Sequence, residues 1–458
     1  MTTINLSLVS HTNVGKTTLM RTLTRQDIGE VADRPHVTEE AESHLLIETP
    51  EGDRLLLWDT PGFGDSARLL KRLRASANPI GWLLTQVWDR FADRPFFCSQ
   101  RAIRNVSEES DVVLYLVNAA EAPAAAGYAE KELEILGWIG KPVVVLLNQM
   151  GPARGREAEA LEEERWSRHL AAHVPTREAI ALDAFARCWV QEDRLLGVVG
   201  GVLAAPSLPA FERLRRAWRV RNVATFDAAM HSIATQLAAA AIDRETADKQ
   251  NPTEGSMNTL ERRLVQAVRE NTDQLIALHG LSGRARERGL VRLAGRFEVN
   301  QPVDVATAGA VGGMVSGALG GLAADIASGG LTLGAGAVIG AILGALGVGG
   351  AARAYNQAHG AQRWSAESLT RHFGEAILRY LAVAHYGRGR GDWVENEYPA
   401  HWLPLIAEVA ARYHRELEPI WNAEGRTADE VTQQLRPLVS RATREVLERL
   451  YPEARELF

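Results

Sequence analysis

A lysine followed by two threonines lies near the N-terminus, at Lys16, Thr17 and Thr18. Lys16 and Thr17 end the run Ser-His-Thr-Asn-Val-Gly-Lys-Thr, which fits the Walker pattern of glycine, four residues and Gly-Lys-Thr, with Ser10 replacing the first glycine. In such a loop, backbone N–H groups point at phosphate oxygens, the lysine adds positive charge and the threonine hydroxyl binds magnesium. The predicted nucleotide-binding residues here are Asn13, Val14, Gly15, Lys16, Thr17 and Thr18.

A second motif follows downstream, where residues 58–62 read Trp-Asp-Thr-Pro-Gly after a β-rich segment. Asp59 would hold magnesium through water and the Gly62 N–H would contact a γ-phosphate, so that hydrolysis releases the segment behind it. Taken alone, the run could be a strand followed by a Pro-Gly turn. Together the two motifs predict a magnesium-dependent nucleotide site at which Lys16 neutralises phosphate charge.

The segments around both motifs alternate between strand and helix patterns. The expected strands are residues 4–9, 43–48, 54–58, 112–118, 143–147 and 179–182, and helices are expected at 129–137 and 156–172. This alternation predicts an α/β P-loop domain over residues 1–204, with a doubly wound, mainly parallel sheet. The first motif lies where a strand passes into a helix, as phosphate binding requires.

Through these motifs roughly residues 1–190 resemble the Era and TrmE group of bacterial GTPases, whose loops read Asn-Val-Gly-Lys-Ser/Thr and Asp-Thr-Pro-Gly. The resemblance implies GTP and GDP as ligands, with Mg²⁺. It also implies that Thr38, in Pro-His-Val-Thr-Glu-Glu, is the switch threonine that closes over magnesium in the triphosphate state and takes part in catalysis. A surface threonine in a loop is the alternative.

Phe63, directly after the second motif, cannot orient water as a glutamine would, so hydrolysis needs another electrophile. Asn13 matches the loop asparagine with which several members of the group help to bind potassium. The resemblance therefore implies K⁺ as a second cation, while an asparagine that closes a turn is the alternative. We expect slow intrinsic turnover that a partner or dimerisation stimulates.

The base-reading motif departs from the group, because residues 148–151 read Asn-Gln-Met-Gly where Asn-Lys-x-Asp is expected. Asn148 and Gln149 remain nucleotide-binding candidates, but the carboxylate that accepts two hydrogen bonds from guanine is replaced by Gly151. Asp183, in the next loop, could supply that carboxylate. Alternatively, Asp183 caps a helix that begins at Ala184.

About residues 63–106 form an insertion longer than a minimal switch needs. It begins with a basic helical run at Arg68, Lys71, Arg72 and Arg74. Because the insertion follows the second motif directly, it could carry the nucleotide state to the rest of the chain. An amphipathic cover for the sheet would explain Trp82, Trp88 and Phe91 equally well.

The chain after residue 204 is predicted to be all α-helical, in two parts, 205–302 and 355–458. Residues have helical spacing over 211–242 and 258–298, and a loop is expected at 248–255. It is similar to a domain attached to such GTPases that has no assigned function. Arginines cluster at 213–221 and 284–292, and they suit either an anionic membrane surface or a solvated helix face.

Between these two parts, residues 303–354 predict a glycine-rich hydrophobic helical hairpin, a glycine zipper. Glycines recur every fourth residue from Gly309 to Gly321 and again from Gly336 to Gly344, on either side of Asp325. Such spacing lets helices pack closely, and about twenty residues in the first arm can cross a hydrocarbon core of roughly 30 Å. Membrane contact through residues 305–352 is predicted, with a hairpin buried among soluble helices as the alternative.

The composition narrows the remaining classes of partner. A net charge of -6 gives no general attraction to nucleic acid, which is therefore an unlikely partner. Cys98 and Cys188 show neither disulfide nor metal spacing, so a reducing compartment is expected. The N-terminus enters the first motif without an apolar leader, so we expect a cytoplasmic protein. With the predicted hairpin, we expect it to be peripheral to or inserted in the inner membrane from the cytoplasmic side.

The leading functional hypothesis is a GTPase that couples its nucleotide state to a helical, membrane-associated effector half. A homo-oligomer or a protein partner is expected. One alternative is a membrane or channel-like assembly protein with a structural or sensing nucleotide site. A second alternative, a GTPase associated with the ribosome or RNA, depends on the resemblance alone.

Overall fold

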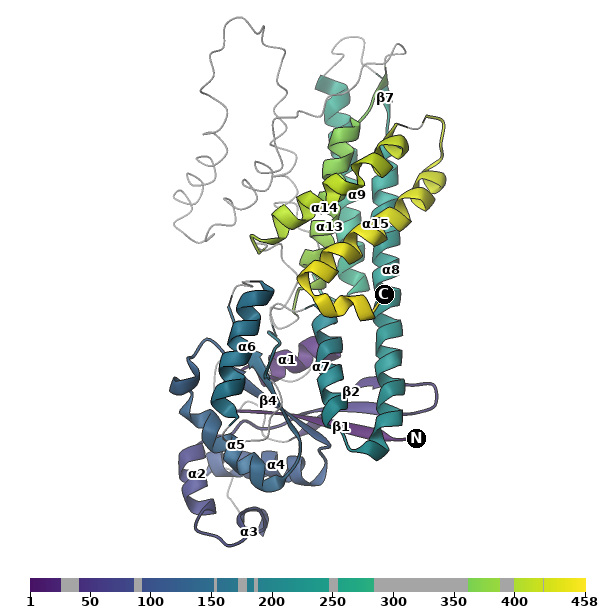
Figure 1. Cartoon of the computed structure of the whole chain (residues 1–458). Coiled ribbons are helices and arrows are strands. Elements are labelled where there is room, and N and C mark those ends of the chain that lie inside the picture. The colour runs from purple at the N-terminus through teal and green to yellow at the C-terminus, as the bar shows by residue number, and fades with distance from the viewer. Residues whose placement is uncertain are drawn as a thin grey trace, which may run out of the picture. The chain divides into compact units, whose positions relative to one another are not determined.

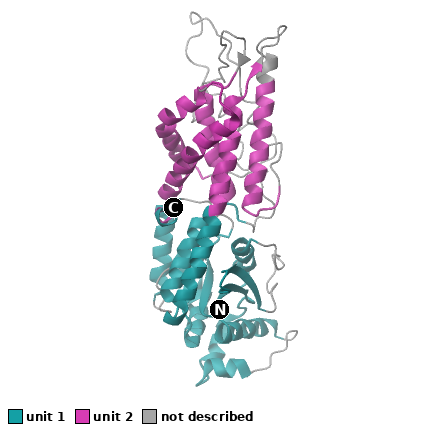
Figure 2. Ribbon diagram, turned by 90° about the vertical axis from the view of Figure 1, so that its right-hand side faces the viewer, with its two compact units in different colours: residues 1–223, 385–391, 455–457 teal, residues 224–384, 392–454, 458 magenta. Residues whose placement is uncertain are grey.

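The structure is a computed structural model that describes residues 1–25, 41–85, 93–151, 155–171, 179–184, 188–246, 254–283, 361–387, 399–422 and 424–458. The chain divides into two compact units (Figure 2). Unit 1 consists of residues 1–223, 385–391 and 455–457, and unit 2 of residues 224–384, 392–454 and 458. The predicted glycine-rich hairpin and the arginine cluster at 284–292 lie outside the described residues.

Unit 1 contains a six-stranded sheet with the order β2-β3-β1-β4-β5-β6 (Figure 1). The strands are β1 (Thr3–Ser10), β2 (Glu42–Glu48), β3 (Arg54–Asp59), β4 (Val112–Asn118), β5 (Val143–Asn148) and β6 (Ala179–Ala181). Only β2 pairs antiparallel, with β3, and the other neighbours pair in parallel. The predicted doubly wound, mainly parallel sheet is therefore confirmed, and its strands occupy the expected segments.

Helices cover both faces of this sheet (Figure 1). They are α1 (Lys16–Thr24), α2 (Ser66–Leu73), α3 (Pro79–Thr85), α4 (Arg94–Glu108), α5 (Gly127–Ile139), α6 (Arg156–Leu170) and α7 (Trp189–Val202), with 3-10 turns at Pro123–Ala125 and Ala205–Ser207. The central strands β4 and β5 are buried along almost their whole length, as expected for parallel strands with helices on both faces. They therefore form a rigid base for the loops at their carboxyl ends.

The pairing of β2 with β3 is interrupted at one point. Leu45 is opposite Leu56 and Ile47 is opposite Leu55, so the register shifts and Leu46 is an extra residue. This is a β-bulge, in which the extra residue has no partner in the ladder. The Leu46 carbonyl oxygen accepts a hydrogen bond from Arg221 Nη1, at 3.4 Å.

The predicted insertion forms α2, α3 and α4. Phe96, Ile103 and other apolar side chains of these helices belong to the core that covers the sheet. Ser7 Oγ in β1 donates to Asn105 Oδ1 in α4, at 2.7 Å, and so joins α4 to the sheet. The guanidinium groups of Arg68 and Arg72 lie over the Phe96 ring, 4.1 and 4.7 Å from its centroid. The insertion thus acts as a cover, although Trp88 and Phe91 lie outside the described residues.

Helix α8 (Leu208–Ile242) begins in unit 1, and four of its arginines bond to other elements of that unit. Arg213 Nε donates to the buried carboxylate of Asp53 at 2.7 Å, and Arg221 reaches β2 as described. Arg215 and Arg219 each donate two hydrogen bonds to Asp193 in α7, at 2.8–3.2 Å. These arginines, which could have suited a membrane surface, therefore fix α8 within unit 1.

Unit 2 is mainly helical. It contains the rest of α8, then α9 (Glu254–Leu278), α13 (Ala366–Ala384), α14 (Trp402–Trp421), α15 (Ala428–Leu450) and most of the 3-10 turn at Pro452–Glu456. The prediction of an all-helical region misses one short antiparallel pair, β7 (Glu245–Thr246) with β8 (Ala361–Gln362). The predicted helical segment 258–298 also extends too far at its C-terminal end. The helix begins at Glu254 and stops at Leu278, because Gly280 takes the left-handed φ of 64°.

A buried polar chain joins α8 to α13. Arg379 donates to Gln236 Oε1 at 3.1 Å, and the Gln236 amide nitrogen lies 2.8 Å from His372 Nε2. His372 Nδ1 lies 3.1 Å from Glu375 Oε2. A guanidinium only donates, so Gln236 must donate to an unprotonated Nε2, and Nδ1–H then donates to Glu375. The chain of bonds thus selects the neutral form of His372.

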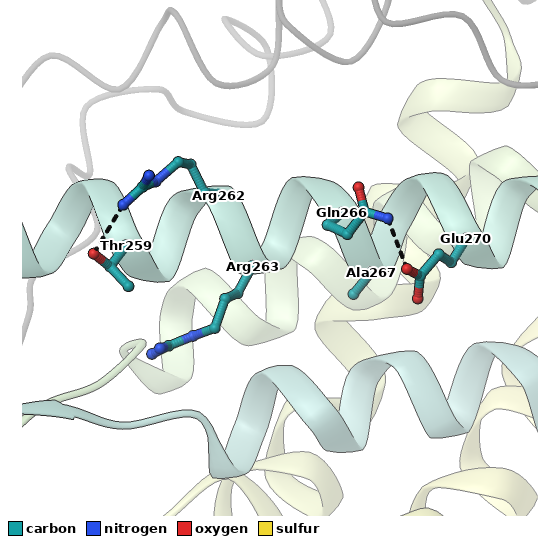
Figure 3. Close-up of a pocket in the computed structure, with 6 residues that line it drawn as sticks. All are labelled: Thr259, Arg262, Arg263, Gln266, Ala267 and Glu270. Carbon is teal, nitrogen blue, oxygen red and sulfur yellow. Dashed lines mark hydrogen bonds between the residues drawn. The ribbon is translucent and has the colours of Figure 1, made fainter.

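A shallow hollow lies along α9, lined by Thr259, Arg262, Arg263, Gln266, Ala267 and Glu270 (Figure 3). Two of its polar contacts are internal to the helix, Arg262 with Thr259 and Gln266 with Glu270.

No helix among the described residues is both long enough and apolar enough to cross a membrane.

Candidate nucleotide site

The phosphate loop connects β1 to α1, as the first motif predicted. Gly15 is the N-cap of α1 and has φ 94°, and Asn13 has φ 63°. Both values lie in the left-handed region that glycine and asparagine adopt most easily. This backbone leads into the N-terminus of α1, where unpaired N–H groups favour an anion. Ser10, at the first motif position, is the buried last residue of β1.

Two of the three predicted magnesium ligands lie in contact. Thr17 Oγ1, in the first turn of α1, donates to Asp59 Oδ2, at the end of β3, with a distance of 2.8 Å. Asp59 is buried and Thr17 is half-buried. A hydroxyl and a carboxylate are oxygen ligands of the kind that Mg²⁺ prefers, and Mg²⁺ commonly takes one or two protein oxygens together with phosphates and water. The residues present therefore fit a magnesium ion.

Lys16 is buried at the base of the loop, with Nζ 3.5 Å from Ser10 Oγ. Burial lowers the pKa of Lys16, while the charges of Asp59 and Glu132 act in the opposite direction. A buried ammonium group with few protein acceptors is suited to bind phosphate oxygens, because their charge offsets its lost hydration.

The second motif packs directly against the phosphate loop. Phe63 N donates to Ser10 O at 2.9 Å and Thr12 N donates to Phe63 O at 3.2 Å, while the Phe63 ring is buried in the core. A Cβ atom on Gly62 would lie 3.2 Å from Thr12 and 3.3 Å from Lys16 Nζ. Only glycine therefore fits easily here, and Gly62 lies beside the lysine that would bind phosphate.

The base-reading loop is tied to the phosphate loop and to the loop after β6. Buried Asn148 donates from Nδ2 to Val14 O at 2.7 Å and accepts at Oδ1 from Ala184 N at 2.8 Å. Gln149 Nε2 donates to Asn13 O at 3.3 Å. Asn148 thus holds three loops together, with its amide nitrogen on the backbone of the phosphate loop.

Asp183 lies in the same group of loops. Its Oδ2 atom accepts a hydrogen bond from Met150 N at 2.8 Å. The helix after this loop begins at Trp189 with Cys188 as its N-cap, so the expected cap by Asp183 of a helix starting at Ala184 is wrong. The carboxylate instead lies against the loop whose usual aspartate is replaced by Gly151.

Glu132, in α5, is a residue of this site that the sequence analysis missed. Its side chain is fully buried and lies 2.6 Å from His11 Nδ1 of the phosphate loop. It also accepts hydrogen bonds from Ser66 Oγ, in α2, and Tyr115 OH, in β4. The available signal was a charged residue on the apolar face of a helix, between Ala129 and Leu136.

Most predicted site residues come together around one loop cluster. They lie on the phosphate loop, on α1, at the last residues of β3 and β5, and in the loops after β3, β5 and β6: Asn13, Val14, Gly15, Lys16, Thr17, Thr18, Asp59, Gly62, Asn148, Gln149 and Asp183. Thr38 lies outside the described residues, so its role stays a prediction. Potassium binding by Asn13 likewise stays a prediction.

Two family models match separate parts of the chain. Residues 5–149 match the family described as 50S ribosome-binding GTPase, and residues 177–397 match a domain of unknown function (DUF3482). No curated protein matches the sequence.

Solved structures give further similarities of low identity. Era in complex with MgGDPNP and 16S ribosomal RNA is 16% identical with a TM-score of 0.32, over 61% of this chain and 90% of that chain. A variant of Aquifex aeolicus Era bound to GDP and AlF4⁻ is 15% identical with a TM-score of 0.31, over 59% and 89%. The FeoB G-domain from Methanococcus jannaschii is 17% identical with a TM-score of 0.23, over 40% and 87%. The two family models together indicate an N-terminal GTPase domain, similar to the family described as 50S ribosome-binding GTPase, and a separate C-terminal DUF3482 domain.

Proposed function

We propose that the protein is a magnesium-dependent GTP-binding and GTP-hydrolysing switch that passes its nucleotide state to its helical half. The contact of Thr17 Oγ1 with Asp59 Oδ2, at 2.8 Å, carries this proposal. It brings together the ends of two motifs that are far apart in the sequence, beside the buried Lys16. Guanine nucleotide binding follows from the GTPase family match.

Thr17 and Asp59 would hold magnesium, which supplies charge neutralisation for the phosphates when bound. Lys16 would bind phosphate oxygens, and the Gly62 N–H would contact the γ-phosphate. In the reaction, water attacks the γ-phosphorus, the bond to the oxygen between the β- and γ-phosphorus breaks, and GDP and phosphate leave. Thr38 would close over the site, and K⁺ near Asn13 would supply charge that Phe63 cannot.

Guanine recognition must differ from that of related GTPases, because Gly151 replaces the aspartate that usually binds the base. Asp183 contacts the base-reading loop at Met150 N, which supports a role for its carboxylate at the base end. Asp183→Ala should then lower the ratio of GDP to ADP affinity about tenfold, the value of one charged hydrogen bond. If both affinities fell by the same factor, Asp183 would only anchor the loop. If neither changed, the proposed role would be wrong.

Two contacts in unit 1 support coupling to the helical half. Arg25, the C-cap of α1, donates to Asn222 of α8, and Arg221 of α8 donates to Leu46 O of β2. Helix α1 follows the phosphate loop, and β2 follows the segment that contains Thr38. A change in either would therefore reach α8, whose later residues belong to unit 2.

Membrane contact through residues 305–352, a position on the cytoplasmic side of the inner membrane, and an oligomer or protein partner remain part of the proposal. The glycine spacing and the length of the first arm support the membrane contact. Cell fractionation of the full chain and of a chain lacking 305–352 tests it. Equal recovery of both in the soluble fraction would contradict membrane contact.

Lys16→Ala tests the enzymatic part. This substitution should abolish GTP-dependent phosphate release, because it removes the buried cation at the phosphate loop. Lys131→Ala is the matched control, since Lys131 Nζ contacts the Gly127 carbonyl of its own helix, at 2.6 Å. Phosphate release by the Lys16→Ala variant at the rate of the control would refute the assignment.

A further inference from the structure

Three donors from three different elements meet at the Glu132 carboxylate. His11 comes from the phosphate loop, Ser66 from the start of α2 and Tyr115 from β4. His11 and Ser66 share Oε1, whereas Tyr115 OH bonds to Oε2 at 2.8 Å. His11 is further held by stacking on Tyr128, with ring centroids 4.7 Å apart.

The burial of this carboxylate carries an unfavourable desolvation free energy. Moving a carboxylate out of water costs several kcal/mol, which its hydrogen bonds must offset. Among the described residues, the hydrogen-bond partners of Glu132 are a histidine, a serine and a tyrosine. Glu132 does add negative charge near Lys16. A buried carboxylate at this position therefore has to be explained by what its three hydrogen bonds hold together.

The partners of Glu132 differ in what they can do. Tyr115 lies in a central buried strand and is a fixed anchor. Ser66 begins the helix that follows Gly62 and Phe63, which is the segment expected to respond to the γ-phosphate. His11 is in the phosphate loop and forms a β-bridge with Phe63. The shared Oε1 atom therefore links the loop to the responding segment through a point fixed on the core.

We infer that Glu132 is a positioning residue that holds the phosphate loop and the segment 62–66 at a fixed spacing through His11 and Ser66, and so aligns Gly62 for hydrolysis. The inference rests on the proposed function, because it concerns the same nucleotide site. Glu132 does not touch the nucleotide in this role. Its loss should therefore affect turnover more than nucleotide binding.

Two substitutions of Glu132 separate geometry from charge. Glu132→Gln keeps the contacts, since the amide oxygen can accept from His11 and Ser66 while the amide NH₂ donates to a reoriented Tyr115 hydroxyl. Glu132→Met fills similar volume but accepts no strong hydrogen bond. We expect kcat to fall about tenfold or more in Glu132→Met, with KM within about threefold, and kcat in Glu132→Gln within about threefold of the native chain.

Ser66→Ala should lower kcat in the same way as Glu132→Met, because it breaks the link to α2. Tyr115→Phe is the matched control. It removes a donor from the same carboxylate without touching the phosphate loop or α2, so its kcat should stay within about threefold of native even if its melting temperature falls. The inference would be overturned if kcat of Glu132→Met equalled that of the native chain, or if kcat fell as much in Tyr115→Phe as in Glu132→Met.

A second measurement does not depend on hydrolysis. Amide hydrogen exchange of residues 62–73, without nucleotide, should rise in Glu132→Met and Ser66→Ala but not in Tyr115→Phe. If the native chain hydrolysed no GTP, the proposed function would fail while this exchange still decided the positioning role. Unchanged exchange in Glu132→Met would refute that role whatever the enzymatic activity.

Discussion

A Cβ atom on Gly15 would lie 2.7 Å from Nδ2 of Asn148, the atom that donates to the Val14 carbonyl. Such a separation is too short for a carbon and a nitrogen that are not bonded. The phosphate loop and the base-reading loop can therefore approach each other only because residue 15 has no side chain. Its φ of 94° excludes most other residues for a second reason.

Gly15→Ala should consequently weaken GDP binding about tenfold or more, because Asn148 or the loop must move. Titration calorimetry would measure this change. Gly140→Ala is the control, since Gly140 also has a left-handed φ, 76°, but open space around its Cβ position. It should cost about 1 kcal/mol of stability and leave GDP affinity unchanged. Native affinity in Gly15→Ala would show that the loops can separate freely.

Asp59→Asn should raise the Mg²⁺ concentration needed for half-maximal phosphate release about tenfold or more. The substitution keeps the size of the side chain and its contact with Thr17 but removes the negative charge at the expected metal ligand. Addition of EDTA to the native chain should stop release completely. Phosphate release in EDTA, or the same Mg²⁺ requirement in Asp59→Asn, would exclude Asp59 as a magnesium ligand.

Asp193→Asn should lower the free energy of unfolding of unit 1 by about 2–3 kcal/mol. The buried carboxylate accepts four hydrogen bonds from Arg215 and Arg219, and the neutral amide leaves two guanidinium groups without their charged partner. Chemical denaturation followed by tryptophan fluorescence would report this change. Asp227→Asn, in the unit 2 part of α8, is a control with a more exposed aspartate, 3.7 Å from Arg444.

His372 should make the helical unit sensitive to mild acid. Burial lowers the pKa of His372 below its ordinary value of 6.5. The unfolded chain then binds more protons than the folded chain, so stability falls as pH decreases below about 6.5. The melting temperature should therefore drop between pH 7.5 and 5.5, and His372→Gln should reduce this drop. His231→Gln, at an exposed position of the same unit, should leave it unchanged.

The sheet could be predicted because its signals are local. Each strand is a short apolar or β-branched run, and all six begin and end within one residue of the expected limits. The contact of Thr17 with Asp59 could also be anticipated, since both residues follow strands whose carboxyl ends meet at one edge of a parallel sheet. Motif spacing and sheet topology together determine this part of the site.

Other features depend on contacts that no local pattern contains. The β7–β8 pair joins residues more than a hundred positions apart, and Leu, Ala and Arg continue at helical spacing past the point where Gly280 ends α9. Glu132 was missed because a glutamate on an apolar helix face has no meaning until His11, Ser66 and Tyr115 are placed around it. The expected helix start at Ala184 was wrong because α7 begins only at Trp189, and the contact of Asp183 with Met150 N in a distant loop has no local signal.

The bulge at Leu46 has a consequence for how sequence length is constrained in β2. Because the extra residue has no partner in β3, its carbonyl can accept a hydrogen bond from Arg221 of α8. Deleting Leu46 would restore a regular ladder with the same cross-strand pairs, so the flanking side chains would keep their faces, but it would remove the carbonyl that Arg221 contacts. Substitutions at Leu46 should therefore leave this backbone contact between β2 and α8 intact, whereas a one-residue deletion should remove it.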